Sequence, residues 1–180
     1  MKLAVTLLFV LSLFSTICFA GSLSGNVKTS GQAVVYLEGG AKAAPSNASY
    51  RVDQKGMKFV PTFLAIPVGA TVEFDNDDAA THNVRWTGHN MGNFNPGQKG
   101  SYKFDRPGAI QLLCSMHPDM SGTIFVSPSP YFSVTDSILG DYFIMNIPDG
   151  QYKVSVWHKG KVTTQDVTVK GNTKLNFIVK

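Results

Sequence analysis

Beyond its first 20 residues, the chain alternates between short apolar runs and short polar turns, with no sustained helical period. Strong β formers fill the run Ala33–Glu38, and a weaker run of the same kind covers Ser22–Lys28. Seventeen glycines and nine prolines are spread along the chain, as is typical of many short strands joined by turns. The pattern predicts an all-β protein.

The strand pattern falls into three parts. Residues 49–126 read as one continuous β domain, and Gly39–Ala48 before it is small and polar, as expected of a loop or linker. The last fifty residues again read as strands, but fifty residues make a marginal core. We therefore expect Ala33–Glu38 to pair with strands of the 131–180 region. The other strands are expected at Thr71–Phe74, Gly100–Phe104, Ala109–Leu113, Thr123–Val126, Gly140–Ile144, Tyr152–His158, Val162–Val169 and Lys174–Val179.

The first 20 residues have the composition of a secretory signal peptide. Lys2 gives a positive start, Leu3–Ile17 is almost wholly apolar, and small residues precede a cleavage site after Ala20. The apolar run is short for a membrane span, and no second such run follows it. We expect a periplasmic or secreted protein with no membrane span in the mature chain. Lipidation at Cys18 is disfavoured, because Ser15-Thr16-Ile17 lacks the small residue needed at the cut.

Removal of this segment leaves Cys114 as the single cysteine, so the mature chain can form no internal disulfide. A lone thiol in an oxidising compartment needs protection, and a metal ion would provide it. Loss of Lys2 leaves 15 Lys and Arg against 12 Asp and Glu, which lowers the formal net charge from +4 to +3. This small, scattered excess does not favour a nucleic-acid partner.

One motif carries metal-binding chemistry. Cys114, His117 and Met120 have a Cys-x2-His-x2-Met spacing, directly after the expected strand Ala109–Leu113. A tight loop leaving a strand can turn a thiolate, an imidazole and a thioether toward one point. His82, at a strand end upstream, supplies a second imidazole, and the four residues complete the ligand set of a blue-copper site. We expect one copper ion per chain, cycling between Cu(I) and Cu(II).

The remaining histidines and methionines are not expected to be ligands. His89 is expected in an exposed Gly-rich loop, and His158 at the surface near a strand end. Met57 and Met91 are interpreted as packing residues, and Met116 as a residue of the ligand loop that points away from the metal.

Residues 49–126 resemble a cupredoxin of the plastocyanin and amicyanin kind. The resemblance rests on Met57–Pro61, Val68–Phe74, His82–Val84 and Cys114–Met120, and the short His-to-Met gap is similar to that of amicyanins. It implies a Greek-key β-sandwich or barrel, a backbone hydrogen bond from Asn83 to the sulfur of Cys114, and a ligand loop stiffened by Pro118. It also implies redox partners such as a c-type cytochrome or a periplasmic dehydrogenase.

The flanking segments resemble a different family, the carboxypeptidase regulatory-like (transthyretin-like) β-sandwich. Gly25-Asn26-Val27, Thr135-Asp136 and Pro148–Tyr152 match its pattern, whereas Ser137-Ile138-Leu139 departs from the usual shorter turn. Secreted bacterial proteins loosely named methylamine-utilization proteins look like the whole chain. The expected organisation is a signal peptide (1–20), the first strands of the small sandwich (21–45), a cupredoxin domain (46–127) and the rest of the sandwich (128–180). The alternative is that 21–45 supplies the first cupredoxin strands.

The function expected from these features is one-electron transfer by a mononuclear type 1 copper protein. Copper storage, delivery or sensing is the alternative, although the sequence has none of the Met-rich or His-rich tracts that often accompany copper handling. An enzyme is not expected, since no orienting group or oxyanion donor can be assigned to Cys114 and His117. Four histidines are too few for the additional centres of a multicopper oxidase or a copper nitrite reductase. A binuclear copper site needs two thiolates, and zinc is disfavoured by the thioether ligand.

Overall fold

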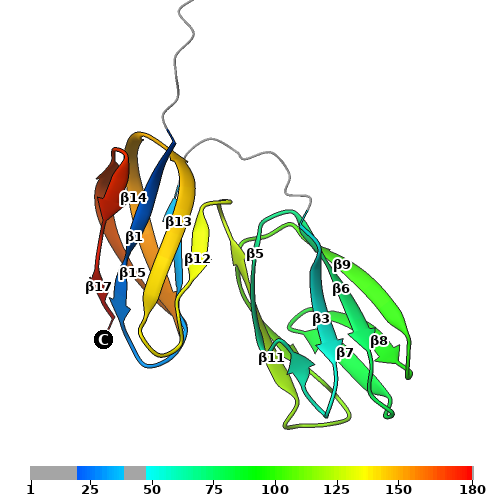
Figure 1. Cartoon of the computed structure of the whole chain (residues 1–180). Helices are drawn as coiled ribbons and strands as arrows, with labels where there is room; N and C mark the ends of the chain where they lie inside the picture. Colours follow the sequence, from blue (N-terminus) through cyan, green and yellow to red (C-terminus); the bar gives the residue numbers. More distant parts are fainter. Residues whose placement is uncertain (1–19, 39–47, 180) are drawn as a thin grey trace, which may run out of the picture.

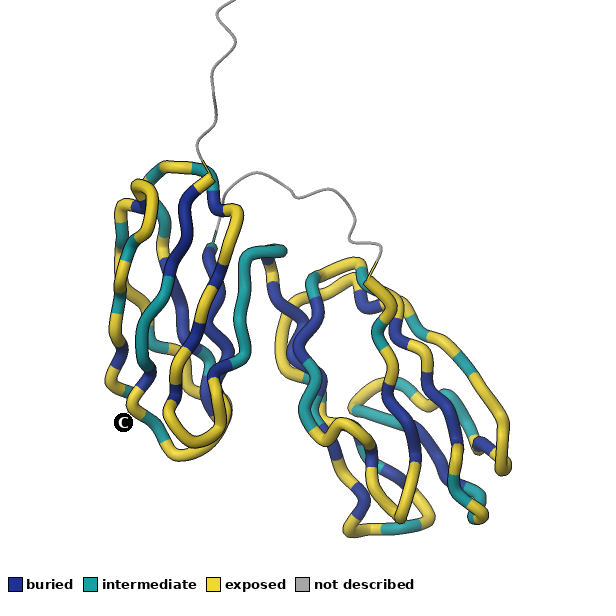
Figure 2. Tube along the Cα trace, viewed as in Figure 1, coloured by how far each residue is buried: buried dark blue, intermediate teal, exposed yellow. Residues whose placement is uncertain are grey.

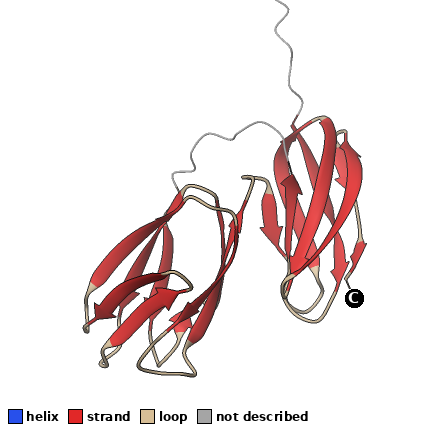
Figure 3. Ribbon diagram, turned by 180° about the vertical axis from the view of Figure 1, so that it is seen from behind, coloured by secondary structure: helices blue, strands red, loops and turns tan. Residues whose placement is uncertain are grey.

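The computed structural model describes residues 20–38 and 48–179, and every helix or strand element in these ranges is a strand. Figure 1 shows two β lobes side by side, and Figure 3 shows the same two lobes from behind. The all-β prediction is therefore confirmed. No described segment forms a helix with the length and hydropathy of a membrane span. The signal-peptide prediction concerns residues that lie almost wholly outside the described ranges.

The central lobe is formed by strands β3 to β11 in two sheets. One sheet has the order β4-β3-β6-β9 and the other has the order β5-β11-β10-β7-β8. The strands are β3 (Tyr50–Gln54), β4 (Phe59–Val60), β5 (Phe63–Pro67), β6 (Ala70–Asn76), β7 (His82–Trp86), β8 (His89–Phe94), β9 (Lys99–Phe104), β10 (Gly108–Leu113) and β11 (Ser121–Ser127). Alternating side chains of both sheets, among them Phe74, Val84 and Ile124, fill a core that also contains Cys114 and Met120.

The terminal lobe combines the two ends of the described chain. Its sheets have the orders β13-β1-β16, with β17 also paired to β1, and β12-β2-β14-β15. The strands are β1 (Ala20–Lys28), β2 (Val34–Glu38), β12 (Phe132–Val134), β13 (Asp141–Pro148), β14 (Gly150–His158), β15 (Lys161–Val169), β16 (Asn172–Lys174) and β17 (Phe177–Ile178). Its core includes Leu23, Val35, Ile144 and Val154.

Strand β2 pairs with β12 on one side and with β14 on the other. This is the pairing expected from the small size of the C-terminal segment, which cannot close a sandwich without β1 and β2. Figure 2 shows a band of buried residues within each lobe, as expected of two separate cores. The assignment of the terminal lobe to the carboxypeptidase regulatory-like family stays a prediction.

A third apolar cluster joins the lobes. Phe125 of β11 packs against Tyr36 and Trp157 of the terminal lobe, with ring centroids 5.4 Å and 5.1 Å apart, and Phe63 stacks on Trp157 at 6.0 Å. The connection between β11 and β12 is also tight, because the Ser127 hydroxyl donates to the carbonyl of Ser129. The chain thus reverses direction between the lobes, and β11 and β12 lie on facing sides of the two lobes (Figure 1).

We predict that Phe125→Ala destabilises the protein by about 3–5 kcal/mol, because the ring is 3% exposed and its removal leaves a cavity between the lobes. Chemical denaturation followed by the fluorescence of Trp86 and Trp157, one in each lobe, measures the change. The control Val68→Ala removes an exposed side chain and should stay within about 0.5 kcal/mol of the parent. Equal stability of Phe125→Ala and the parent would contradict this packing.

Candidate metal centre

The expected ligands come from the start of β7 and from the loop between β10 and β11. His82 is the first residue of β7, and Cys114 directly follows β10, which pairs with β7 through Leu113 and Arg85. The ligand atoms of His82, Cys114 and His117 all lie within 4.8 Å of one another. The fold therefore brings together two imidazoles and a thiolate that are far apart in the sequence.

The separations suit a single ion. His82 Nδ1 lies 3.0 Å from His117 Nδ1, and Cys114 Sγ lies 3.6 Å from His117 Nδ1. Two nitrogens about 2 Å from one ion and a sulfur about 2.3 Å from it are separated by roughly 3–4 Å in tetrahedral or trigonal geometry. The donor set therefore fits a bound metal, and its mixture of imidazole and thiolate suits copper.

The ligand loop is closed by its own backbone. The Cys114 N–H donates to the Met120 carbonyl at 3.2 Å, and the Met120 N–H donates to the His117 carbonyl at 2.9 Å. These bonds hold the thiolate, imidazole and thioether residues on one compact turn. Met120 is 1% exposed and shares the central core with Cys114.

Asn83 connects the two ligand segments. Its backbone N–H donates to Cys114 Sγ at 3.3 Å, as the cupredoxin resemblance implied. Its side-chain oxygen accepts the Ser115 hydroxyl at 3.0 Å, and its amide nitrogen donates to the Gly92 carbonyl at 2.9 Å. One residue therefore links β7, β8 and the ligand loop, and it places a donor on the sulfur.

Asp78 holds the opposite side of His82. Its Oδ2 lies 3.0 Å from His82 Nε2 and accepts the backbone N–H of Met57 at 2.9 Å. The bond from Met57, followed by that from His82, lowers the pKa of Asp78 below its usual range. An ionised Asp78 accepts a hydrogen bond from a protonated Nε2, which leaves Nδ1 of His82 free to face Cys114 and His117. Sequence reasoning did not identify this residue.

The ligands differ in their access to solvent. His82 is 0% exposed and Cys114 is 4% exposed, whereas His117 is half-buried. Met116, next to it, is 48% exposed. His117 is thus the most exposed of the four expected ligands.

Three expectations about the other histidines and methionines were wrong. His89 begins strand β8 and packs its ring against Trp86 and Tyr102, both at 4.5 Å. His158 is 7% exposed, because its Nδ1 pairs with the carbonyl of Gln32 at 3.0 Å and its ring lies inside the terminal lobe. Met57 is 50% exposed at the tip of the β3–β4 hairpin and does not pack in the core.

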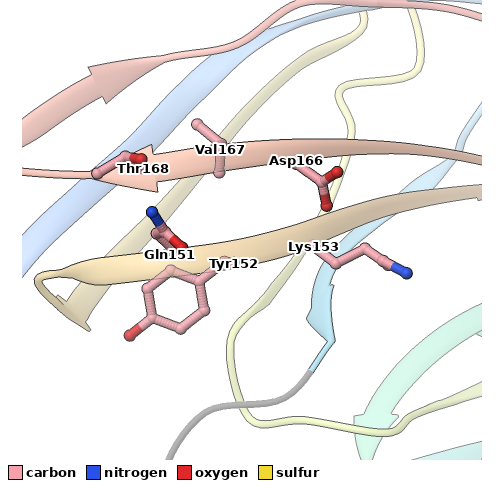
Figure 4. A pocket seen from close by; sticks show the side chains of 6 residues that line it. All are labelled: Gln151, Tyr152, Lys153, Asp166, Val167 and Thr168. Atoms are coloured by element: carbon pink, nitrogen blue, oxygen red, sulfur yellow. The ribbon is translucent and has the colours of Figure 1, made fainter.

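A surface hollow of about 460 Å³ lies on the β14–β15 hairpin of the terminal lobe. Figure 4 shows its six lining side chains: Gln151, Tyr152, Lys153, Asp166, Val167 and Thr168. None of them is a histidine, cysteine or methionine, so this hollow is separate from the candidate metal centre.

Comparison with known proteins gives the same assignment for the central lobe. Residues 46–127 match the copper binding proteins of the plastocyanin/azurin family. Amicyanin-alpha of Methylorubrum extorquens is 28% identical over 117 residues, which cover 61% of this chain and 97% of amicyanin-alpha. This segment is therefore a cupredoxin domain with homology to amicyanin, and copper is the metal that this family binds.

Solved structures similar to the chain include a purple cupredoxin from Nitrosopumilus maritimus, which is 28% identical and has a TM-score of 0.42. The match covers 44% of this chain and 100% of that chain. An oxidised amicyanin variant has 26% identity, 48% and 90% coverage, and a TM-score of 0.43. A copper-containing nitrite reductase from Thermus scotoductus SA-01 has 30% identity, 51% and 25% coverage, and a TM-score of 0.42.

We predict that Asp78→Asn exposes the Nε2 proton of His82 to faster exchange, because a neutral amide accepts it more weakly than a carboxylate. Side-chain ¹⁵N NMR of the histidines measures this exchange. The matched control is Asp77→Asn, which removes the same charge at the neighbouring residue. The carboxylate of Asp77 pairs with Arg51. Equal effects of the two substitutions would show that the carboxylate of Asp78 does not hold His82.

Proposed function

We propose that this protein is a periplasmic or secreted type 1 copper protein that carries single electrons between redox partners, with His82, Cys114, His117 and Met120 as ligands. The convergence of the two Nδ1 atoms and the hydrogen-bonded sulfur carries this proposal. The expected signal peptide supports the location. The homology to amicyanin supports electron transfer with protein partners, such as a c-type cytochrome or a periplasmic dehydrogenase.

Bound copper supplies a one-electron couple between Cu(I) and Cu(II). The protein holds its ligands in nearly the same positions in both states, because each is tied down by contacts that do not involve the metal. His82 is fixed by Asp78, Cys114 by Asn83, and the ligand loop by its own backbone bonds. A ligand set that does not rearrange keeps the reorganisation energy of electron transfer low.

The half-buried His117 is the route by which electrons leave. Its neighbours Met116 and Pro118 are both exposed and apolar, so they surround the imidazole with a small dry surface. Weak redox encounters use small interfaces, and this surface suits a transient partner.

Copper storage or delivery uses the same ligands and is the alternative that experiment must separate. A relay requires a reversible reduction potential and retention of Cu(I) in the presence of a chelator. Rapid loss of Cu(I) to a chelator, together with irreversible voltammetry, would favour delivery.

We predict an intense visible absorption band, from thiolate-to-copper charge transfer, when the protein receives one equivalent of Cu(II). Cys114→Ser should abolish this band, because the oxygen ligand has no comparable transition. The control Ser115→Ala changes the next residue in the loop and leaves the sulfur in place. A colourless Cu(II) protein, or a band that survives Cys114→Ser, would exclude the site.

We also predict that Met120→Leu keeps the band but raises the reduction potential, because a weak thioether ligand would tune the potential and its loss would favour Cu(I). Protein-film voltammetry measures the shift. The Met116→Leu variant is the matched control, because it makes the same change at an exposed position of the same loop. A potential that is unchanged in Met120→Leu would argue against Met120 as a ligand.

A further inference from the structure

The terminal lobe holds two large aliphatic side chains out in solvent on a tightly built loop. Ile138 is 88% exposed and Leu139 is 68% exposed. Asp136 Oδ1 accepts the backbone N–H groups of both, at 2.8 Å and 2.7 Å. The Gly140 N–H donates to the Asp136 carbonyl, which closes the loop. This is the Ser137-Ile138-Leu139 segment that departs from the pattern of the resembled family.

Gly140 anchors this loop to β1. Its φ is +75°, and a Cβ there would lie 2.3 Å from the carbonyl oxygen of Val27, so only glycine fits. The Gly140 carbonyl also accepts the Val27 N–H at 2.9 Å. The two aliphatic side chains therefore project from a fixed base, and nothing in the described fold covers them.

Three turns share this end of the lobe. The loop 135–140 is tied to Ala33 by two bonds through Thr135, and His158 is tied to Gln32. The turn after His158 therefore lies beside the turn between β1 and β2. Lys28 and Lys159 are exposed on these turns and form no ion pair with a described residue, and Lys161 is exposed nearby.

The two carboxylates of the same end are exposed, and both are held in hydrogen bonds. The Asp136 carboxylate accepts the loop amides, and Asp141 accepts the side-chain amide of Asn26 at 2.9 Å. The outer face thus combines protruding aliphatic side chains with three exposed lysines and two hydrogen-bonded carboxylates. Apolar side chains beside an excess of lysines bind bilayers with negatively charged lipids. Protein interfaces use Trp, Tyr and Arg as their strongest contacts, and this tip has none of them.

We propose that this end of the terminal lobe docks on a bilayer containing anionic phospholipids, with Ile138 and Leu139 inserted among the lipids and Lys28 and Lys159 at the headgroups.

The docking would also orient the metal centre. Phe63, paired with Thr123 at the start of β11, stacks on Trp157, so the ligand loop before β11 lies at the same end as the three turns. His117 would then face the membrane surface and redox proteins embedded in it. This consequence rests on the proposed function, whereas the docking does not.

The test is co-sedimentation of the copper-loaded chain starting at Gly21, so that the apolar first 20 residues cannot insert. Vesicles contain phosphatidylcholine alone or phosphatidylcholine with phosphatidylglycerol. We expect binding to the anionic vesicles and a loss of about tenfold or more in the partition coefficient of Ile138→Ser/Leu139→Ser. The matched control Phe143→Ser/Met145→Ser removes two exposed apolar side chains from β13 and should bind like the parent.

A second pair of variants tests whether the lysines of this end are needed for binding to anionic lipids. Lys28→Gln/Lys159→Gln should lose binding to anionic vesicles, and Lys170→Gln/Lys174→Gln, located away from this end, should not. Equal binding to both vesicle types, equal effects of the paired variants, or no binding by the parent would overturn the proposal. A change in oligomeric mass of Ile138→Ser/Leu139→Ser, without a change in vesicle binding, would assign the tip to a second copy of the chain and overturn it as well. The visible band of each variant reports separately on the copper site, so the two proposals can fail independently.

Discussion

The hydrogen bond from the Asn83 backbone to the Cys114 sulfur is the contact on which the site depends. It spans the strand that carries His82 and the loop that carries the other three expected ligands. A buried thiolate without a donor would be costly, and this donor is supplied by the fold rather than by a mobile side chain. The position of the sulfur is therefore set before a metal arrives, and so is the distance between the two imidazoles.

Further hydrogen bonds around this one hold the ligand residues to neighbouring strands. Asp78 links His82 to the tip of the β3–β4 hairpin, and the side chain of Asn83 reaches β8 and Ser115. Through Phe125, the terminal lobe packs against the face of the β11 sheet that points away from the central core. It leaves the ligand loop uncovered. The molecule thus has a rigid, accessible metal end and a second lobe whose exposed tip lies toward that same end.

The features of the fold and of the candidate site that depend on local spacing could be predicted from the sequence. The Cys-x2-His-x2-Met run identified the ligand loop, alternation identified most strands, and the size of the C-terminal segment predicted the pairing of β2. Sequence reasoning missed what depends on contacts between distant segments. The role of Asp78 arises from a hairpin tip that the chain reaches 21 residues earlier, and the burial of His158 arises from a partner 126 residues away. The packing of His89 required knowing that β7 and β9 bring Trp86 and Tyr102 against it.

The central claim is that the protein fixes one ligand set for both oxidation states. X-ray absorption spectroscopy of the reduced and oxidised copper protein tests it most directly. We expect one short copper–sulfur bond and two copper–nitrogen bonds in each state, with only small changes in length between them. Loss of a nitrogen ligand on reduction at neutral pH, or a first shell of oxygen atoms in the oxidised protein, would contradict it.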